Sequence, residues 1–417
     1  MRRKRILFVE QNTDGTIGGS HHSLLLLVQH LDRDAFEPIV AFYERHALIE
    51  EFERCARVVL LPSPAPILLG PASGARSSSP VAIAATLVQK AVNVTRSAAA
   101  VLARMAIVVS RLRPDVIHMN NSVITGAEWP IAARLCGAPI VAHQRGFGPP
   151  TWYAGMFDRI ICISRAVRDD LIERAPQLAS RAVQIHNGID IKRYVAQSAA
   201  NPVALRRELG VADHELIIGL VGNLQSWKGQ DVLLRALPAL RTSRPWRCLL
   251  IGGTPSDEDS QRYHAQLLDI ARGSGLDTRV TFTGYRRDVA AVIGIVDVLV
   301  HTSVAPEPFG RVILEGMALA KPVVATDQGG PREIIEPGRT GFLVAPGDRG
   351  ALAQCLDQLL ESEALRAKIG AAAAARVADH FTAGAYAARV EETYRTLWPA
   401  RDPGAIRPVN RAGSDAR

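Results

Sequence analysis

The chain has 417 residues and a formal net charge of +8, and 47% of its residues are hydrophobic while 5% are aromatic. This length exceeds the usual single hydrophobic core, so we expect two domains in a globular protein. The basic excess would suit nucleic acid, a membrane surface or an anionic substrate, but no aromatic residues are interleaved with the basic ones. Without a base-stacking platform, we expect no nucleic-acid partner.

Cysteine spacing and hydropathy give two further expectations. The five cysteines show neither Cys-x-x-Cys spacing nor grouping with histidines, which indicates free thiols in a reducing cytoplasm and no metal or disulfide. The basic residues 2–5 precede Ile6–Val9, an apolar run too short for a signal peptide and ended by Glu10. This run predicts a first buried strand. No uncharged apolar run approaches about 18 residues, so no transmembrane helix is predicted.

The first strand leads into a polar loop that contains Gly18 and Gly19, and an apolar helix, His21–Leu31, follows. A strand, a glycine loop and a helix N-terminus in this order let a ligand come close to the backbone. Strands near Ile39–Phe42 and Val58–Leu61 continue an alternating α/β pattern.

The next segment, residues 54–114, contains no Asp or Glu and eight Arg or Lys. A loop rich in Pro, Gly and Ser is followed by a helical pattern that ends near Arg111, with an apolar stripe opposite a basic face. The basic face predicts contact with an anionic membrane surface. The alternative is that the stripe packs on the domain's own sheet and the arginines are solvated; both can hold together.

Strands predicted to end at His118 and His143 come next, and then a helix capped by Ser164. A lone histidine after a strand is more often structural than catalytic. A second run of strands begins near Leu216, and its first loop carries Asn223 and Lys228. The later Asp-Glu-Asp at 257–259 is predicted to be a solvated acidic loop rather than a metal site.

The most informative stretch is Ala305–Thr326. Prolines before Gly310 and helical apolar spacing after it predict a helix that starts near Gly310. Glu307 then precedes the helix, and Glu315 lies about one and a half turns inside it. A helix N-terminus can hold a diphosphate, while carboxylates accept hydrogen bonds from hydroxyls. A nucleotide-sugar offers this combination of groups.

Glu307 and Glu315, followed by Gly316-Met-Ala-Leu-Ala-Lys-Pro-Val-Val-Ala-Thr and then Gly-Gly-Pro-Arg-Glu333, resemble the retaining glycosyltransferases of family 4 (glycosyltransferase group 1). The resemblance implies an α/β protein with the GT-B fold, in which two Rossmann-like, doubly wound domains face an interdomain cleft.

Domain bounds follow from the pattern of predicted elements. We expect an N-terminal, acceptor-side domain over residues 1–190, a linker over 191–212 and a C-terminal, nucleotide-sugar-binding domain over 213–378. A C-terminal helix over 379–400 is expected to pack back on the N-terminal domain. Residues 401–417 are expected to form a disordered tail.

The family implies roles for individual residues. Glu307 would take the hydroxyls of the donor sugar, His143 resembles the cleft histidine that faces the transferred sugar, and Lys228 would contact the donor diphosphate; these are the catalytic candidates. Asn223 stands where the family has an arginine, a loss for which Arg311 would compensate. The candidates for donor binding are Gly18, Gly19, Asn223, Lys228, Phe309, Gly310, Arg311 and Glu315.

The resemblance therefore implies transfer of a sugar from a UDP- or GDP-sugar to a hydroxyl of a glycan or lipid-linked acceptor, in cell-surface polysaccharide or glycolipid synthesis. No cofactor or metal is expected beyond the donor. The expected location is cytoplasmic, peripheral on the inner face of the membrane through residues 54–114. The alternatives are a non-catalytic protein that binds a nucleotide-sugar or a partner, and a nucleotide-sugar epimerase. Product analysis with the donor alone separates the two enzymes.

Overall fold

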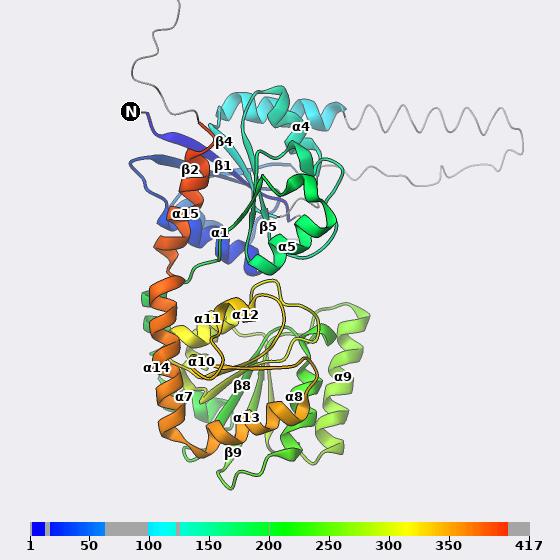
Figure 1. Cartoon of the computed structure of the whole chain (residues 1–417), viewed down its shortest axis with the longest axis vertical. Coiled ribbons are helices and arrows are strands. Elements are labelled where there is room, and N and C mark those ends of the chain that lie inside the picture. The colour runs from blue at the N-terminus through cyan, green and yellow to red at the C-terminus, as the bar shows by residue number, and fades with distance from the viewer. Residues whose placement is uncertain (1, 13–16, 63–98, 122–125, 200, 399–417) are drawn as a thin grey trace, which may run out of the picture.

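A computed structural model describes residues 2–12, 17–62, 99–121, 126–199 and 201–398. It contains two parallel sheets, each with helices on its faces, and the two stand one above the other in Figure 1. The part built on the seven-stranded sheet is called the N-terminal unit below, and the part built on the six-stranded sheet the C-terminal unit. These two parallel sheets, each with helices on its faces, confirm the predicted α/β fold class.

The N-terminal sheet has the order β3-β2-β1-β4-β5-β6-β7, and every pairing is parallel. Its strands are β1 (Lys4–Glu10), β2 (Phe36–Phe42), β3 (Arg57–Leu60), β4 (Val116–Met119), β5 (Ile140–Gln144), β6 (Arg159–Cys162) and β7 (Ala182–Gln184). Its helices are α1 (Gly19–His30), α2 (Ile49–Glu53), a helix described over 99–112, α4 (Glu128–Leu135) and α5 (Arg165–Arg174).

The C-terminal sheet has the order β10-β9-β8-β11-β12-β13, also parallel throughout. Its strands are β8 (Leu216–Val221), β9 (Trp246–Ile251), β10 (Val280–Gly284), β11 (Val298–His301), β12 (Val323–Thr326) and β13 (Phe342–Val344). Its helices are α8 (Gln230–Ala236), α9 (Glu258–Gly273), α10 (Val289–Ile295), α11 (Arg311–Ala318), α12 (Pro331–Ile334), α13 (Arg349–Glu361) and α14 (Glu363–His380). Short 3-10 turns occur in both units: η1 (Ala154–Met156) and η2 (Pro176–Leu178) in the N-terminal unit, and η3 (Ser226–Lys228) and η4 (Leu237–Ala239) in the C-terminal unit.

The central strands are almost entirely apolar because helices cover both faces of a parallel sheet. Ile6–Val9 of β1 is 0% exposed, as is Val298–Val300 of β11. The predicted first strand is therefore confirmed. The predicted helix start near Gly310 is also confirmed, since α11 begins at Arg311, and the side chain of Ser164 caps α5 as predicted.

The chain passes between the two units twice, and the two passages pair with each other. Ile189 forms a parallel bridge with Thr382, supported by hydrogen bonds from Ile189 N to Phe381 O at 2.9 Å and from Ala383 N to Ile189 O at 3.1 Å. After the second passage α15 (Ala383–Arg395) packs against α1, so the last helix returns to the N-terminal unit (Figure 1).

Three expected features take a different or only partly described form. Residues 191–212, expected as a linker, contain α6 (Ile191–Ser198) and α7 (Pro202–Glu208). The acidic 257–259 segment is the start of α9, where the Asp257 side chain accepts a hydrogen bond from Ser260 N. The expected disordered tail and most of the helical pattern before residue 99 lie outside the described residues.

Candidate active site

The charged candidates of the C-terminal unit gather where the strand order of its sheet reverses. β8 and β11 are neighbours although two strands separate them in the sequence. The loop after β8 carries Lys228, and the loop after β11 carries Glu307. Open α/β sheets bind ligands beyond the carboxyl ends of their strands at such a reversal. The topology therefore explains why two residues 79 positions apart meet.

The Glu307 carboxylate is held through one of its oxygens. Lys228 Nζ lies 2.8 Å from Oε2, His301 Nε2 lies 3.1 Å from it, and Ser303 Oγ donates to it at 3.4 Å. Among the described residues none donates to Oε1. Burial alone would raise the pKa of Glu307, but the His301 contact and the charge of Lys228 lower that pKa to about 2. Glu307 is therefore a carboxylate at neutral pH.

His301, the last residue of β11, was given no role by the sequence analysis. Its side chain is buried, and its Nδ1 has no partner among the described residues. Leaving a buried N–H without an acceptor is costly, so we assign the proton to Nε2, which then donates to Glu307. The only sequence signal for this role is a histidine at the end of a buried strand, six residues before Glu307.

Lys228 is fixed by its neighbours on both sides. Its Nζ lies 3.9 Å from the centroid of the Trp227 ring, a cation–π contact that the sequence analysis did not foresee. Gly229 has a φ of 67°, and a Cβ there would lie 2.2 Å from the carbonyl oxygen of Thr302. The Thr302 hydroxyl in turn donates to Gly229 O at 2.8 Å. This close approach locks the loop after β8 to the loop after β11.

The Gly329-Gly330 motif packs against the segment that carries Glu307. Gly330 N donates to Glu307 O at 2.8 Å, and a Cβ on Gly330 would lie 2.3 Å from Phe309 Cα. Gly310, the N-cap of α11, has a φ of 94°, which favours glycine. The two motifs thus position the Glu307 backbone and the free N–H groups at the start of α11 together.

A second cluster joins the two units. Arg311 donates to Gly19 O at 2.6 Å, and its guanidinium lies 3.5 Å from the Glu315 carboxylate. Gly18 is the N-cap of α1, so the predicted glycine loop does lie opposite α11. Tyr194 of α6 is a further neighbour: burial raises the pKa of its hydroxyl, and the Glu315 carboxylate raises it further.

Two predicted donor-binding residues lie outside these clusters. The Phe309 side chain is 2% exposed and packs against the rings of His186 and Phe381, at centroid distances of 5.7 Å and 6.4 Å. Only the Phe309 backbone remains available to a ligand. Asn223 is exposed, and its side chain bonds no described residue, while its carbonyl oxygen accepts from Gln230 at 2.9 Å.

His143, the predicted cleft histidine, is buried among polar side chains. Its side chain is 0% exposed, and its Nδ1 lies 3.2 Å from His118 Nε2 and 3.4 Å from an Arg145 nitrogen. His118 contacts the Tyr394 hydroxyl through its other nitrogen. Burial lowers the pKa of both imidazoles, that of His118 to about 3. His143 is therefore a buried, neutral histidine in this structure.

The described residues were searched for metal sites and for membrane-spanning helices. Among the described residues no group of three or more His, Cys, Asp or Glu could hold a metal ion. Within the same residues no helix is both long and apolar enough to cross a membrane.

Comparison with known proteins identifies the family. Two family models match: Glycosyltransferase Family 4 over residues 17–193, and Glycosyl transferases group 1 over residues 204–376. The D-inositol 3-phosphate glycosyltransferase of Stackebrandtia nassauensis is 30% identical over 325 residues, which are 70% of this chain and 72% of that protein. The chain belongs to glycosyltransferase family 4. It is a nucleotide-sugar glycosyltransferase, as its motifs predicted, and the non-catalytic and epimerase alternatives are set aside.

Other members of the family show the same likeness. The putative glycosyltransferase EpsD of Bacillus subtilis is 28% identical over 65% of this chain and 74% of its own length. The crystal structure of Anabaena HepE in complex with UDP and glucose matches with a TM-score of 0.74 and 27% identity, over 95% of this chain and all of that one. A glycosyltransferase from Rickettsia africae, 21% identical, has a TM-score of 0.77 over 95% of this chain and 99% of its own. These neighbours confirm the GT-B fold.

Proposed function

We propose that this family 4 glycosyltransferase transfers a sugar from a UDP- or GDP-sugar to a hydroxyl of a glycan or lipid-linked acceptor, with retention of anomeric configuration. The observation that carries the proposal is the contact of Lys228 with Glu307 beside the N-terminus of α11. A cation and free backbone N–H groups suit a leaving diphosphate, and a carboxylate suits the hydroxyls of the sugar.

Each residue has a role that its contacts support. Lys228 and the first N–H groups of α11 stabilise the charge that develops on the leaving diphosphate. Glu307 accepts sugar hydroxyls through Oε1, the oxygen to which no described residue donates. Glu315 takes the ribose hydroxyls. Arg311, 3.5 Å from Glu315, supplies a cation in place of the one that Asn223 lacks.

Glu307 acts by accepting hydrogen bonds rather than by forming a covalent bond or supplying a proton. Its pKa of about 2 leaves no proton to donate near neutral pH. Three donors around Oε2 reduce its nucleophilicity, and Lys228 is the closest of them at 2.8 Å. The leaving phosphate oxygen therefore takes the proton of the acceptor hydroxyl.

Relatives support the choice of donors. HepE was crystallised with UDP and with UDP-glucose. A relative from Mycobacterium tuberculosis, 30% identical over 56% of this chain and 61% of its own length, is a GDP-mannose-dependent alpha-mannosyltransferase. A uridine or guanosine diphosphate-sugar is accordingly the proposed donor, with no metal required.

The acceptor proposal rests on the basic segment 54–114. In its described part the helix over 99–112 buries Met105, Val109 and Leu112, while Arg104 and Arg111 are exposed. The apolar side thus packs inward, and the basic side is available to anionic head groups. We propose a cytoplasmic enzyme, peripheral on the inner face of the membrane, that acts in cell-surface polysaccharide or glycolipid synthesis.

The test is thermal stabilisation of the purified chain by UDP-, GDP-, ADP- and dTDP-sugars. A ligand at about 100 times its dissociation constant stabilises the folded state by about 2.7 kcal/mol. We expect a shift with one uridine or guanosine donor, lost in Glu315→Ala and kept in Glu258→Ala, an exposed position on α9. If no nucleotide-sugar raises the melting temperature, the assigned donor site is wrong.

A further inference from the structure

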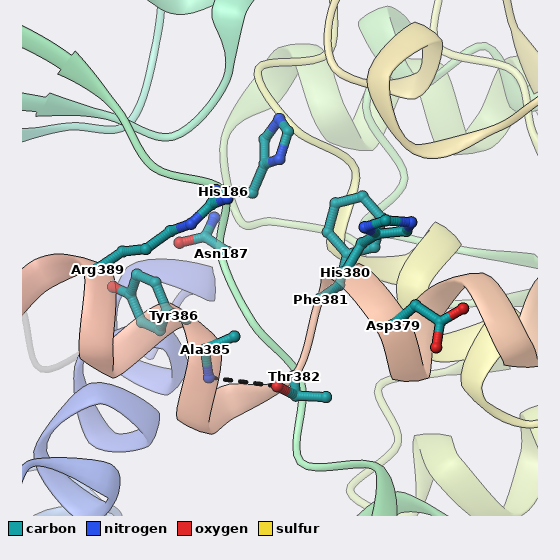
Figure 2. A pocket seen from close by; sticks show the side chains of 9 residues that line it. All are labelled: His186, Asn187, Asp379, His380, Phe381, Thr382, Ala385, Tyr386 and Arg389. Carbon is teal, nitrogen blue, oxygen red and sulfur yellow. Dashed lines mark hydrogen bonds between the residues drawn. The ribbon is translucent and has the colours of Figure 1, made fainter.

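A cavity of about 430 Å³ lies beside the two passages between the units, and is called the hinge cavity below. Four arginines line it: Arg165 and Arg389 from the N-terminal unit, and Arg332 and Arg376 from the C-terminal unit. Figure 2 shows the neighbouring smaller pocket, into which Arg389 extends from α15 toward the segment of His186. The lining of the hinge cavity includes neither Lys228 nor either donor-site glutamate, so it is separate from the active site.

Two of the four arginines have carboxylate partners, and two have none among the described residues. Arg332 pairs with Asp327 at 2.7 Å, and Arg376 pairs with Glu336. The guanidinium groups of Arg165 and Arg389 make no hydrogen bond or ion pair with a described residue, and both residues are exposed. Arginine stays protonated in proteins, so two unneutralised cations lie on the wall of one cavity.

The single carboxylate that lines the hinge cavity is already fully engaged. Glu333 accepts hydrogen bonds from Arg165 N at 2.8 Å, from Ala166 N at 2.9 Å and from His186 Nε2 at 2.7 Å. Burial opposes its charge, but these contacts hold the pKa of Glu333 below its ordinary value. The Glu333 carboxylate is thus bonded to the N-terminus of α5 and to His186, and it makes no ion pair with the arginine side chains of the cavity.

A further lining residue lacks a partner. Gln184, at the end of β7, has a buried side-chain nitrogen that donates to no described residue. A buried N–H without an acceptor is unfavourable, and a ligand oxygen would satisfy it. Unpaired guanidinium groups and an unpaired amide N–H call for the same kind of partner, an anion with several oxygens.

We propose that the hinge cavity binds a phosphate-containing anion of about diphosphate size. Guanidinium groups bind phosphate oxygens in a bidentate manner, and the volume lies within the range of small-molecule sites. The two unpaired cations, Arg165 and Arg389, both come from the N-terminal unit, and an anion bound between them and the C-terminal wall of the cavity neutralises their mutual repulsion.

The anion also favours one arrangement of the two units. His186 and Phe381, which line the hinge cavity, pack against Phe309, the residue just before the N-cap of α11. A ligand that draws Arg165 and Arg389 toward the C-terminal unit therefore stabilises the packing behind the donor site. It acts as a positioning ligand and does not touch the reacting atoms.

The test is calorimetric titration of the full chain with inorganic diphosphate and, separately, inorganic phosphate. Lys228→Ala removes the main cation of the donor site, so binding that persists in this variant belongs elsewhere. In the Lys228→Ala background we expect Arg165→Ala with Arg389→Ala to weaken diphosphate binding by about tenfold or more. The matched control, Arg207→Ala with Arg244→Ala, removes two exposed arginines without described side-chain partners and should change binding by less than about twofold.

Two results would overturn the proposed binding site, and a third would overturn the proposed ligand size. One is the loss of all diphosphate binding in Lys228→Ala alone, which assigns it to the donor site. The other is equal binding by the two double-arginine variants. Diphosphate should bind more tightly than phosphate, since its second phosphate group can contact a second arginine of the cavity. Equal affinity limits the ligand to one phosphate group and overturns the proposed size. The readout involves no sugar transfer, so failure here is distinguishable from failure of the proposed reaction.

Discussion

The contact of Lys228 with Glu307 should be measurable as a coupling free energy. Lys228→Met removes the cation but keeps an unbranched side chain that packs on Trp227. Both partners are largely buried, with side chains 19% and 12% exposed. The variant therefore leaves a buried carboxylate with only the hydrogen bonds from His301 and Ser303. Removing one member of a buried pair is destabilising because the remaining charge stays desolvated.

The magnitude follows from the pKa of Glu307. A change from 4.5 to about 2 corresponds to about 3 kcal/mol, at about 1.4 kcal/mol for each pH unit. That figure is the sum of unfavourable burial and all favourable contacts, of which Lys228 is one. We therefore expect Lys228→Met to lower the free energy of unfolding by about 2 kcal/mol at pH 7, and by much less when Glu307→Gln is already present.

The assay is urea unfolding of the wild type, the two single variants and the double variant, followed by tryptophan fluorescence. The folded pKa of Glu307 lies below the unfolded value, so its stabilisation is complete above about pH 4.5 and is lost as the pH falls through about 2. The difference between wild type and Glu307→Gln should narrow across this window. If Lys228→Met costs as much with Gln at 307 as with Glu, the carboxylate is not the reason for the penalty.

Two further predictions concern the same loops. In His301→Ala, loss of the Nε2 donor should raise the pKa of Glu307 and shift the acid limb of the pH–rate profile upward by about one pH unit. His301→Asn should restore part of this shift. If the acid limb does not shift in His301→Ala, His301 contributes packing but no hydrogen bond to Glu307. Gly229→Ala is compared with the control Gly210→Ala, because the two glycines have nearly the same φ, 67° and 68°. The Cβ added at Gly229 would lie 2.2 Å from Thr302 O, whereas the Cβ added at Gly210 has no atom within 4 Å. Gly229→Ala should therefore be about 2 kcal/mol or more costlier in thermal unfolding, and equal melting temperatures would contradict the close approach.

The helix at the centre of the candidate donor site could be predicted from sequence because its signals are local. Prolines, one glycine and helical spacing within twenty residues determine where α11 begins, and both glutamates are placed relative to that start. Lys228 became a candidate through its place in the order of the family's motifs, because no residue spacing within this sequence indicates its role. Its meeting with Glu307 depends on β8 and β11 being neighbours, a topology that no local pattern encodes.

Contacts between distant segments were not predictable in this way. Glu333 was visible as part of a motif, but its partners Arg165 and His186 lie 168 and 147 positions away, in the other unit. Similarly, Arg311 reaches Gly19 across 292 positions. Such pairs follow from how two units face each other, and sequence periodicity describes only the faces within a unit.

His143 shows that predicting a strand does not by itself predict the surroundings of a side chain at its end. The pattern predicted a strand ending at this residue, and β5 does include it. The surroundings of such a residue depend on distant segments: Arg145 contacts His143 and is itself held by hydrogen bonds to Asn120 O at 2.8 Å and to the Asn120 side-chain oxygen at 2.7 Å. A buried, neutral imidazole in contact with a guanidinium cannot readily gain a proton.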